Sequence, residues 1–153
     1  MITITVDTSD LTRKLADFPD ALARAQRKAL DYIGQRVASD ATRAFKTASL
    51  RPSPWAPRKD KKATHPLLIK HPTGGLWKSI KPRLEGDDTV VIGSDKEYAI
   101  YHQQGTKNMP ARPFFPIDKN GQLTPRIMRK IKADVEAAYK EEIDKVFANG
   151  GGG

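Results

Sequence analysis

The sequence contains no cysteine, which removes several kinds of site at once. Disulfide frameworks, thiolate zinc sites and cysteine nucleophiles are excluded, and the chain is compatible with a reducing compartment. Histidine is also scarce, with His65, His71 and His102 as its three copies. His65 and His71 lie in a basic, proline-rich stretch whose positive charge would repel a metal ion, so we expect no metal site and no cofactor.

Long apolar runs and nucleotide-binding glycine motifs are missing as well. No apolar run approaches the length of about eighteen residues that a membrane span needs, and the N-terminus does not resemble a leader peptide. We therefore expect a soluble chain with no membrane partner. Gly74-Gly75 does not follow a strand and open a helix, as phosphate-binding loops do. Because no nucleophile, base and orienting group form a recognisable pattern, we expect that the protein is not an enzyme.

What the chain does contain is enough for one domain. Its 153 residues can bury about 68–70% of the surface of the unfolded chain. Hydrophobic residues make up 38% of the sequence, and 11 prolines and 11 glycines indicate long connections between elements. A modest core with long connections suggests that partners add stability. We predict a single domain over residues 1–149 and a flexible glycine tail over residues 150–153.

The spacing of apolar residues in the first third predicts a strand followed by helices. Residues 1–6 alternate between apolar and polar types, which is typical of a half-buried strand. A helical stripe then predicts a short helix to about Asp17 and a longer one from Pro19 to about Thr47, because proline is tolerated in a first turn but not in a helix interior. The stripe consists of Leu11, Leu15, Phe18, Leu22, Ala29, Ile33, Val37, Ala41 and Phe45.

The second half predicts a hairpin and a closing helix. Residues 79–84 and 90–92 read as two strands, and Gly86-Asp87-Asp88 between them supplies the turn. Thr124-Pro125 opens a last helix whose apolar stripe runs to Val146. The predicted fold class is therefore α+β, with a long N-terminal helix and a C-terminal helix packed on a small antiparallel sheet.

The net charge of +9 is concentrated in one segment. Between Lys46 and Arg83 the chain has ten basic residues and one acid, Asp60, so the rest of the chain is neutral overall. Five prolines prevent regular structure over residues 48–75, where we predict an extended basic loop. Such a loop either lies against a polyanion or an acidic protein surface, or is simply solvated. The candidate partner or DNA contacts are Trp55, Arg58, Lys59, Lys61, Lys62 and Trp77.

Trp55, in the middle of this loop, has two interpretations. It can dock on a partner or stack on a nucleic-acid base among the surrounding lysines. It can equally fold back to cover the long helix, as a large apolar side chain commonly does. The sequence leaves both alternatives open.

Residues 98–115 hold four of the nine Tyr and Phe residues and are the segment most suited to function. Ser94 and Glu97 have the spacing of a capping box, and Gly105 stands where a helix needs a left-handed stop, so a short helix is predicted here. Three prolines after position 109 then fix the backbone as a stiff, extended arm.

This proline arm carries Phe114 and Phe115, which need either the subunit's own core or a groove on a neighbour. Tyr98 and His102 are one helical turn apart and share a face. They either bond locally and anchor the next loop, or they help hold the arm at a subunit boundary. The candidate interface residues are Tyr98, His102, Gln103, Gly105, Arg112, Pro113, Phe114 and Phe115.

The chain contains two sequence patterns with a characteristic order and spacing. One is Tyr98-Ala99, His102-Gln103, Gly105-Thr106 and Pro110-Ala111-Arg112-Pro113-Phe114-Phe115. The other is Leu67-Leu68-Ile69, Thr73-Gly74-Gly75-Leu76 and Ser79-Ile80, preceded by His71-Pro72 where an acidic residue is commoner. In their order and spacing, the chain resembles the virion morphogenesis and tail-completion proteins of tailed bacteriophages, notably those of Mu-like and P2-like phages.

The resemblance implies a structural protein of the virion: a small α+β subunit that forms a ring, with six copies as the expected number. The ring would lie at the head–tail junction or the top of the tail tube, complete the tail and join it to the head. Its partners would be neck, connector, tube or sheath proteins, and its basic segment would face acidic neighbours or passing DNA. We expect it in the neck or tail of the virion, and in the host cytoplasm during assembly.

A second function comes from the charge alone. Residues 46–83 could form a basic nucleic-acid-binding module, with binding that weakens steeply as salt is added. No recognised nucleic-acid-binding motif accompanies the charge. Ring formation and salt-sensitive DNA binding by a monomer are therefore the two outcomes that separate the hypotheses.

Overall fold

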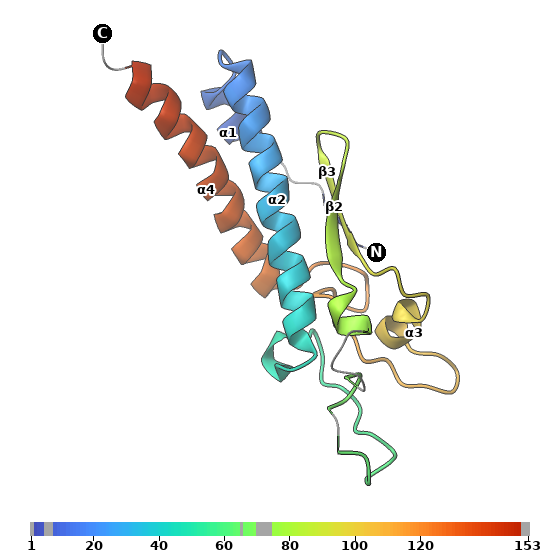
Figure 1. Ribbon diagram of the computed structural model, residues 1–153. Helices are drawn as coiled ribbons and strands as arrows, with labels where there is room; N and C mark the ends of the chain where they lie inside the picture. Colours follow the sequence, from blue (N-terminus) through green and yellow to red (C-terminus); the bar gives the residue numbers. More distant parts are fainter. Residues whose placement is uncertain (1, 5–7, 65, 70–74, 151–153) are drawn as a thin grey trace.

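The structure is a computed structural model that describes residues 2–4, 8–64, 66–69 and 75–150. It has the predicted α+β architecture, in which long helices pack with a small antiparallel sheet (Figure 1). The helices are α1 (Ser9–Lys14), α2 (Pro19–Ala44), α3 (Ala99–Gln104) and α4 (Pro125–Gly150), with short 3-10 turns η1 (Ala48–Leu50) and η2 (Leu76–Lys78). The strands are β1 (Ile2–Ile4), β2 (Lys81–Glu85) and β3 (Thr89–Gly93).

Several predicted boundaries can be compared directly with these elements. The hairpin is confirmed with its turn at Gly86, whose φ is +63°. Helix α2 begins at Pro19 as predicted but ends three residues before Thr47. Helix α4 continues through Gly150, and the remaining tail residues, like His65 and His71, lie outside the described residues.

Helix α2 ends early because the following turn captures its last carbonyl groups. The guanidinium of Arg51 donates to the carbonyl oxygen of Ala44 at 2.7 Å and to that of Phe45 at 3.2 Å. The last carbonyls of a helix have no partner within it, so this side chain satisfies them. The chain then enters the long loop, which extends beyond the end of α2 in Figure 1.

Helix α2 is the central element of the fold. It packs against α4 on one side and against the β2–β3 hairpin on the other (Figure 1). Gly34 allows the close approach of the hairpin, because a Cβ atom there would lie 2.8 Å from Cβ of Pro82 and 2.9 Å from Cγ2 of Val90. Buried alanines on the same helix allow its close packing in the core.

The sheet has the strand order β1-β3-β2, and both pairs are antiparallel. Pro82 opposite Ile92 and Leu84 opposite Val90 place apolar side chains on the face that meets α2. Successive side chains of a strand point to opposite faces, so Lys81 and Arg83 lie on the outer face. Strand β2 is at the edge of the sheet, where a proline is tolerated.

A row of ion pairs joins α2 and α4. The carboxylate of Asp40, with 1% of its surface exposed, accepts a hydrogen bond from Arg126 at 2.9 Å. At the other end of the row, Glu142, also 1% exposed, accepts from Lys28 at 3.0 Å and from Arg24 at 3.2 Å. Because buried carboxylates need such partners, the row fixes how the two helices align.

None of the described helices combines the length and apolar character needed to cross a membrane.

Candidate assembly surface and basic groove

The proline arm ends inside the subunit's own core. Phe114 has no exposed surface and Phe115 is 4% exposed, and the ring of Phe114 lies 5.0 Å from that of Phe45. The two neighbouring rings pack on each other at 4.7 Å. The sequence left open whether these rings pack in the subunit's own core or in a groove on a neighbour. They pack in the core, so they are not available as anchors on the surface of the folded subunit.

Gln103 explains why the arm turns inward. Its Oε1 atom accepts hydrogen bonds from the backbone amides of Phe114 at 3.0 Å and Phe115 at 3.1 Å. One side chain on α3 therefore satisfies two amides of a segment whose prolines offer few donors of their own. Gln103 acts within the subunit in this structure.

Gly105 and Arg112 complete the reversal of the chain after α3. Gly105 has φ of +76°, and a Cβ atom there would lie 2.7 Å from the amide nitrogen of Ala111. The amide of Arg112 donates to the carbonyl oxygen of His102 at 2.7 Å. The helix stops at Gly105 as predicted, but with ψ of 172°, outside the left-handed helical conformation. Glycine is needed there both for its positive φ and for space.

The start of α3 differs from the prediction of a capping box. The helix begins after Tyr98, whose side chain makes no capping hydrogen bond. The Oγ atom of Ser94 instead accepts from the amide of Lys96 at 3.0 Å and contacts Oγ of Ser79. A serine hydroxyl readily bonds to an amide two residues ahead, and that local bond holds a turn here in place of a helix start.

Trp55 folds back on the end of the long helix, which is the second of its two interpretations. Its indole ring lies 5.7 Å from that of Phe45, and the guanidinium of Arg51 lies 3.7 Å from its centroid. Its Nε1 atom donates to the carbonyl oxygen of Pro113 at 2.7 Å. The base of the basic loop is thus held against the proline arm.

Arg112 strengthens the same attachment. Its guanidinium donates to the carbonyl oxygens of Ala56 at 3.0 Å and Pro57 at 3.2 Å. Beyond this attachment the loop carries the exposed residues Lys59, Lys61 and Lys62, while Arg58 is half-buried. The predicted loop contacts therefore divide into a packed base and an exposed basic part.

Tyr98 and His102 do share a face of α3, as predicted, with their rings edge to face at 5.9 Å. Burial, followed by the positive charge of Arg112, lowers the pKa of His102 below its ordinary value. Among the residues that the structure describes, Nδ1 of His102 has no hydrogen-bond partner. The local anchoring expected of this residue comes instead from its backbone carbonyl.

Helix α3 exposes an unusual number of large apolar side chains for its length. Tyr98, Ile100 and Tyr101 have 43%, 53% and 54% of their surface exposed. We call these three residues the α3 patch. Sequence reasoning identified Tyr98 but missed Ile100 and Tyr101, although the signal was present as three large side chains among the four consecutive residues 98–101.

A second apolar surface lies among β1, α1 and α4. It is a cavity of about 740 Å³, which we call the α1–α4 groove. Met128 on its rim has 51% of its surface exposed. Its lining combines apolar side chains with a polar rim: Ile4, Thr8, Ser9, Asp10, Leu11, Leu123, Met128, Arg129, Ile131, Lys132, Val135 and Glu136.

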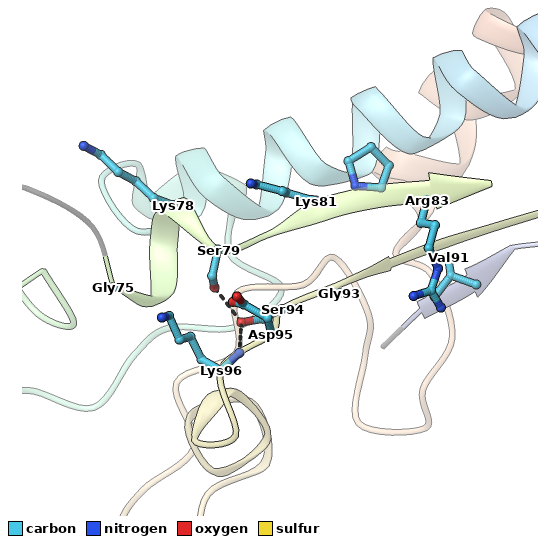
Figure 2. A pocket seen from close by; sticks show the side chains of 11 residues that line it. Gly75, Lys78, Ser79, Lys81, Arg83, Val91, Gly93, Ser94, Asp95 and Lys96 are labelled. Atoms are coloured by element: carbon cyan, nitrogen blue, oxygen red, sulfur yellow. Dashed lines mark hydrogen bonds between the residues drawn. The ribbon is translucent and has the colours of Figure 1, made fainter. Parts of the chain in front are cut away.

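A third surface is a cavity of about 470 Å³ between β2 and the turn at residues 94–96 (Figure 2). We call it the basic groove, because four of its lining residues are basic and one, Asp95, is acidic. It is lined by Gly75, Lys78, Ser79, Lys81, Pro82, Arg83, Val91, Gly93, Ser94, Asp95 and Lys96.

Trp77 lies beside this groove, but lysine side chains cover its ring. The indole is half-buried, and the ammonium groups of Lys46 and Lys78 lie 4.7 Å and 5.0 Å from its ring centroid. The ring therefore supports two lysines through cation–π contacts. Over the described ranges, no three His, Asp or Glu side chains gather as metal ligands would.

Comparison with known proteins adds two similarities. The model of the phage virion morphogenesis family matches residues 6–136. The Mu-like prophage FluMu G protein 1 of Haemophilus influenzae is 50% identical over 36 residues, which are 24% of this chain and 25% of that protein. The matched stretch thus spans about a quarter of the relative's length. No solved structure matches the chain significantly.

Proposed function

Since this chain belongs to the phage virion morphogenesis family, we propose that it is a structural subunit that assembles into a closed ring in the neck of the phage particle. The ring, with six copies as the expected number, lies at the head–tail junction or at the top of the tail tube. There it completes the tail and joins it to the head through contacts with neighbouring neck, connector, tube or sheath proteins. In this role the protein acts by shape and contact, not by catalysis.

The observation that carries the proposal is the α3 patch. Tyr98, Ile100 and Tyr101 lie within four consecutive residues at the start of α3, each with more than two fifths of its surface exposed. Aromatic and aliphatic side chains gathered in this way are typical anchors of a protein interface. The buried proline arm and Gln103 hold this helix firmly on the subunit, so the anchors are presented without a large loss of conformational entropy on binding.

A closed ring also needs a second, different patch on each subunit, because head-to-tail contacts are heterologous. The α1–α4 groove supplies a suitable one, since it is apolar and large enough to receive aromatic side chains. The groove is formed by β1, α1 and α4, and no residue of the α3 patch lines it. One copy can therefore offer α3 to the groove of the next while its own groove accepts a third copy.

The first experiment removes the α3 patch. We expect I100S/Y101S to stay folded, because both side chains are exposed, and to be a monomer where the unaltered chain forms rings. Circular dichroism reports the fold, and native mass spectrometry over a range of concentrations reports the assembly. The matched control is F147S, which removes another exposed ring, 55% exposed, at the far end of α4. Rings that persist in I100S/Y101S would contradict this interface.

The second experiment tests the heterologous contact itself. M128E places a charge at the rim of the α1–α4 groove and should also give monomers. M128E keeps its α3 patch, and I100S/Y101S keeps its α1–α4 groove. A mixture of the two proteins should therefore form one-to-one dimers and no rings. A mixture that stays entirely monomeric would show that these two surfaces do not bind each other.

A further inference from the structure

The basic groove joins three cations from the end of the basic segment 46–83 to Lys96, which lies outside that segment. Lys78 comes from η2, Lys81 and Arg83 from β2, and Lys96 from the turn before α3. Figure 2 shows the side chains of the three lysines extending toward one end of the groove, with Arg83 toward the other end. Four cations around one cavity make a concentrated positive field.

The floor of the groove is held in place by a chain of hydrogen bonds. Ser79 Oγ donates to the carbonyl oxygen of Leu76 at 2.6 Å, so its hydroxyl proton is used. The hydroxyl of Ser94 is therefore the donor in its bond to Ser79, and it accepts from the amide of Lys96 at 3.0 Å. This chain ties η2, which carries Lys78, to the turn at residues 94–96, which carries Lys96 (Figure 2).

The lining of the groove holds one acid against four cations. Asp95 is the acidic residue in its lining. Arg83 pairs with Glu85, but both side chains are largely exposed, at 65% and 48%. Such exposed pairs contribute little energy, so an incoming anion can replace the carboxylate.

The chemistry of the lining selects among anionic partners. Val91 is 5% exposed, and Trp77 beside the groove is covered by two ammonium groups. The groove thus lacks the exposed apolar anchors that a protein partner usually needs and the open aromatic ring on which an unpaired base would stack. Cations from η2, β2 and the turn at residues 94–96 line one groove, and several cations along one surface suit contact with a series of phosphates.

We propose that the basic groove binds the phosphate backbone of double-stranded DNA without regard to sequence. This inference does not depend on the ring, because every residue involved belongs to one subunit. In an assembled ring the same groove would bring each subunit into contact with DNA that passes it.

The test measures how binding to a 20-base-pair DNA duplex changes with salt. With about three to four phosphates contacted, the logarithm of affinity should fall with a slope of about −2.7 to −3.6 against the logarithm of salt concentration. This corresponds to roughly a hundredfold loss between 50 and 200 mM salt. Fluorescence anisotropy gives both quantities. The monomeric I100S/Y101S background is measured in parallel, so that failure of the ring proposal does not affect the result.

Three double variants that each remove two charges then locate the site. K81Q/K96Q should make the slope less negative by about 2, since each lost phosphate contact removes about 0.9. K59Q/K61Q alters the exposed basic loop, and K14Q/K119Q alters exposed lysines that line none of the described grooves; both should keep the slope of the unaltered chain. Circular dichroism confirms that all three are folded.

Each alternative result would overturn the proposal. An unchanged slope in K81Q/K96Q, with a reduced slope in K59Q/K61Q, would assign DNA binding to the loop. Equal reductions in all three variants would indicate attraction to net charge alone. If the unaltered chain did not bind the DNA duplex at 50 mM salt, an acidic protein surface would be the partner assigned to the groove.

Discussion

The indole nitrogen of Trp55 donates a hydrogen bond of 2.7 Å to the carbonyl oxygen of Pro113, 58 residues further along the chain. This bond connects the base of the basic loop to the proline arm. Phe45 lies between the two, with its ring 5.7 Å from Trp55 and 5.0 Å from Phe114. The end of α2, the loop and the arm are therefore one packed cluster, and substitutions in it act on folding before they act on any partner.

Replacing Trp55 by Phe tests the hydrogen bond separately from the ring. W55F keeps an aromatic ring against Phe45 but leaves the carbonyl of Pro113 without this donor, so we expect a loss of about 0.5–1.5 kcal/mol in the free energy of unfolding. Urea denaturation at low protein concentration measures it. W55A should lose considerably more, because packing is removed as well. Equal stability of W55F and the unaltered chain would show that the bond is exchanged for water at no cost.

Replacing Phe114 by Ala tests the internal position of the proline arm. The side chain is fully buried, so the cavity it leaves should lower the free energy of unfolding by about 3–5 kcal/mol. The same denaturation experiment applies, with Y101A as the matched control because that ring is 54% exposed. If F114A were instead as stable as the unaltered chain but unable to form rings, Phe114 would be an anchor in a neighbour and not part of the core.

At Gly34, packing predicts that replacement by Ala lowers stability, whereas helix propensity alone predicts that it raises stability. In an exposed helix interior, Gly to Ala stabilises by about 1 kcal/mol. In G34A the new Cβ atom would lie 2.8 Å from Pro82 and 2.9 Å from Val90, so the hairpin must move away from α2. We expect a net loss of about 1–3 kcal/mol, the usual cost of overpacking. Thermal unfolding measures it, and Q35A at the exposed neighbouring position should change stability little.

Much of the fold could be predicted because it depends on local patterns. The proline at position 19, the stripe along α2, the hairpin turn and Gly105 each act over a few residues, and the structure confirms all four. The predicted capping box failed for a reason that local spacing cannot reveal. Ser94 is held by Ser79, fifteen residues earlier, and by the turn that contains it.

The surfaces were less predictable because they depend on which distant segments meet. The sequence gathered its candidate DNA contacts on the loop, where the charge is densest, whereas the basic groove joins β2 to Lys96 across the hairpin. The sequence left open whether Phe114 and Phe115 pack in the core or on a neighbour, because nothing in it shows that Gln103 holds their amides. The ion pairs of α2 with α4 connect residues about a hundred positions apart and were missed for the same reason.

The buried carboxylate of Glu142 makes stability depend on pH in the acid range. Burial alone would raise its pKa, but hydrogen bonds from Lys28 and Arg24, together with the charges of Lys28 and Lys145, outweigh burial and hold the pKa below the ordinary value of 4.5. A carboxyl group whose pKa is lower in the folded state stabilises the protein above the unfolded pKa, and this contribution is lost as the pH falls through the folded pKa. Stability should therefore be steady near pH 7 and decline below about pH 4.5.

The substitution E142Q isolates this contribution. At pH 7 it removes the charge that Lys28 and Arg24 bind, and we expect a loss of about 1.5–3 kcal/mol, the range for hydrogen bonds to a charged group. As the pH falls through the folded pKa, the unaltered chain loses the same charge, so the difference between the two proteins should shrink. Urea midpoints at pH 7 and pH 3 test this, with E136Q on the exposed side of α4 as the control. A difference that stays constant between the two pH values would show that Glu142 stabilises the helix pair by packing, not by its charge.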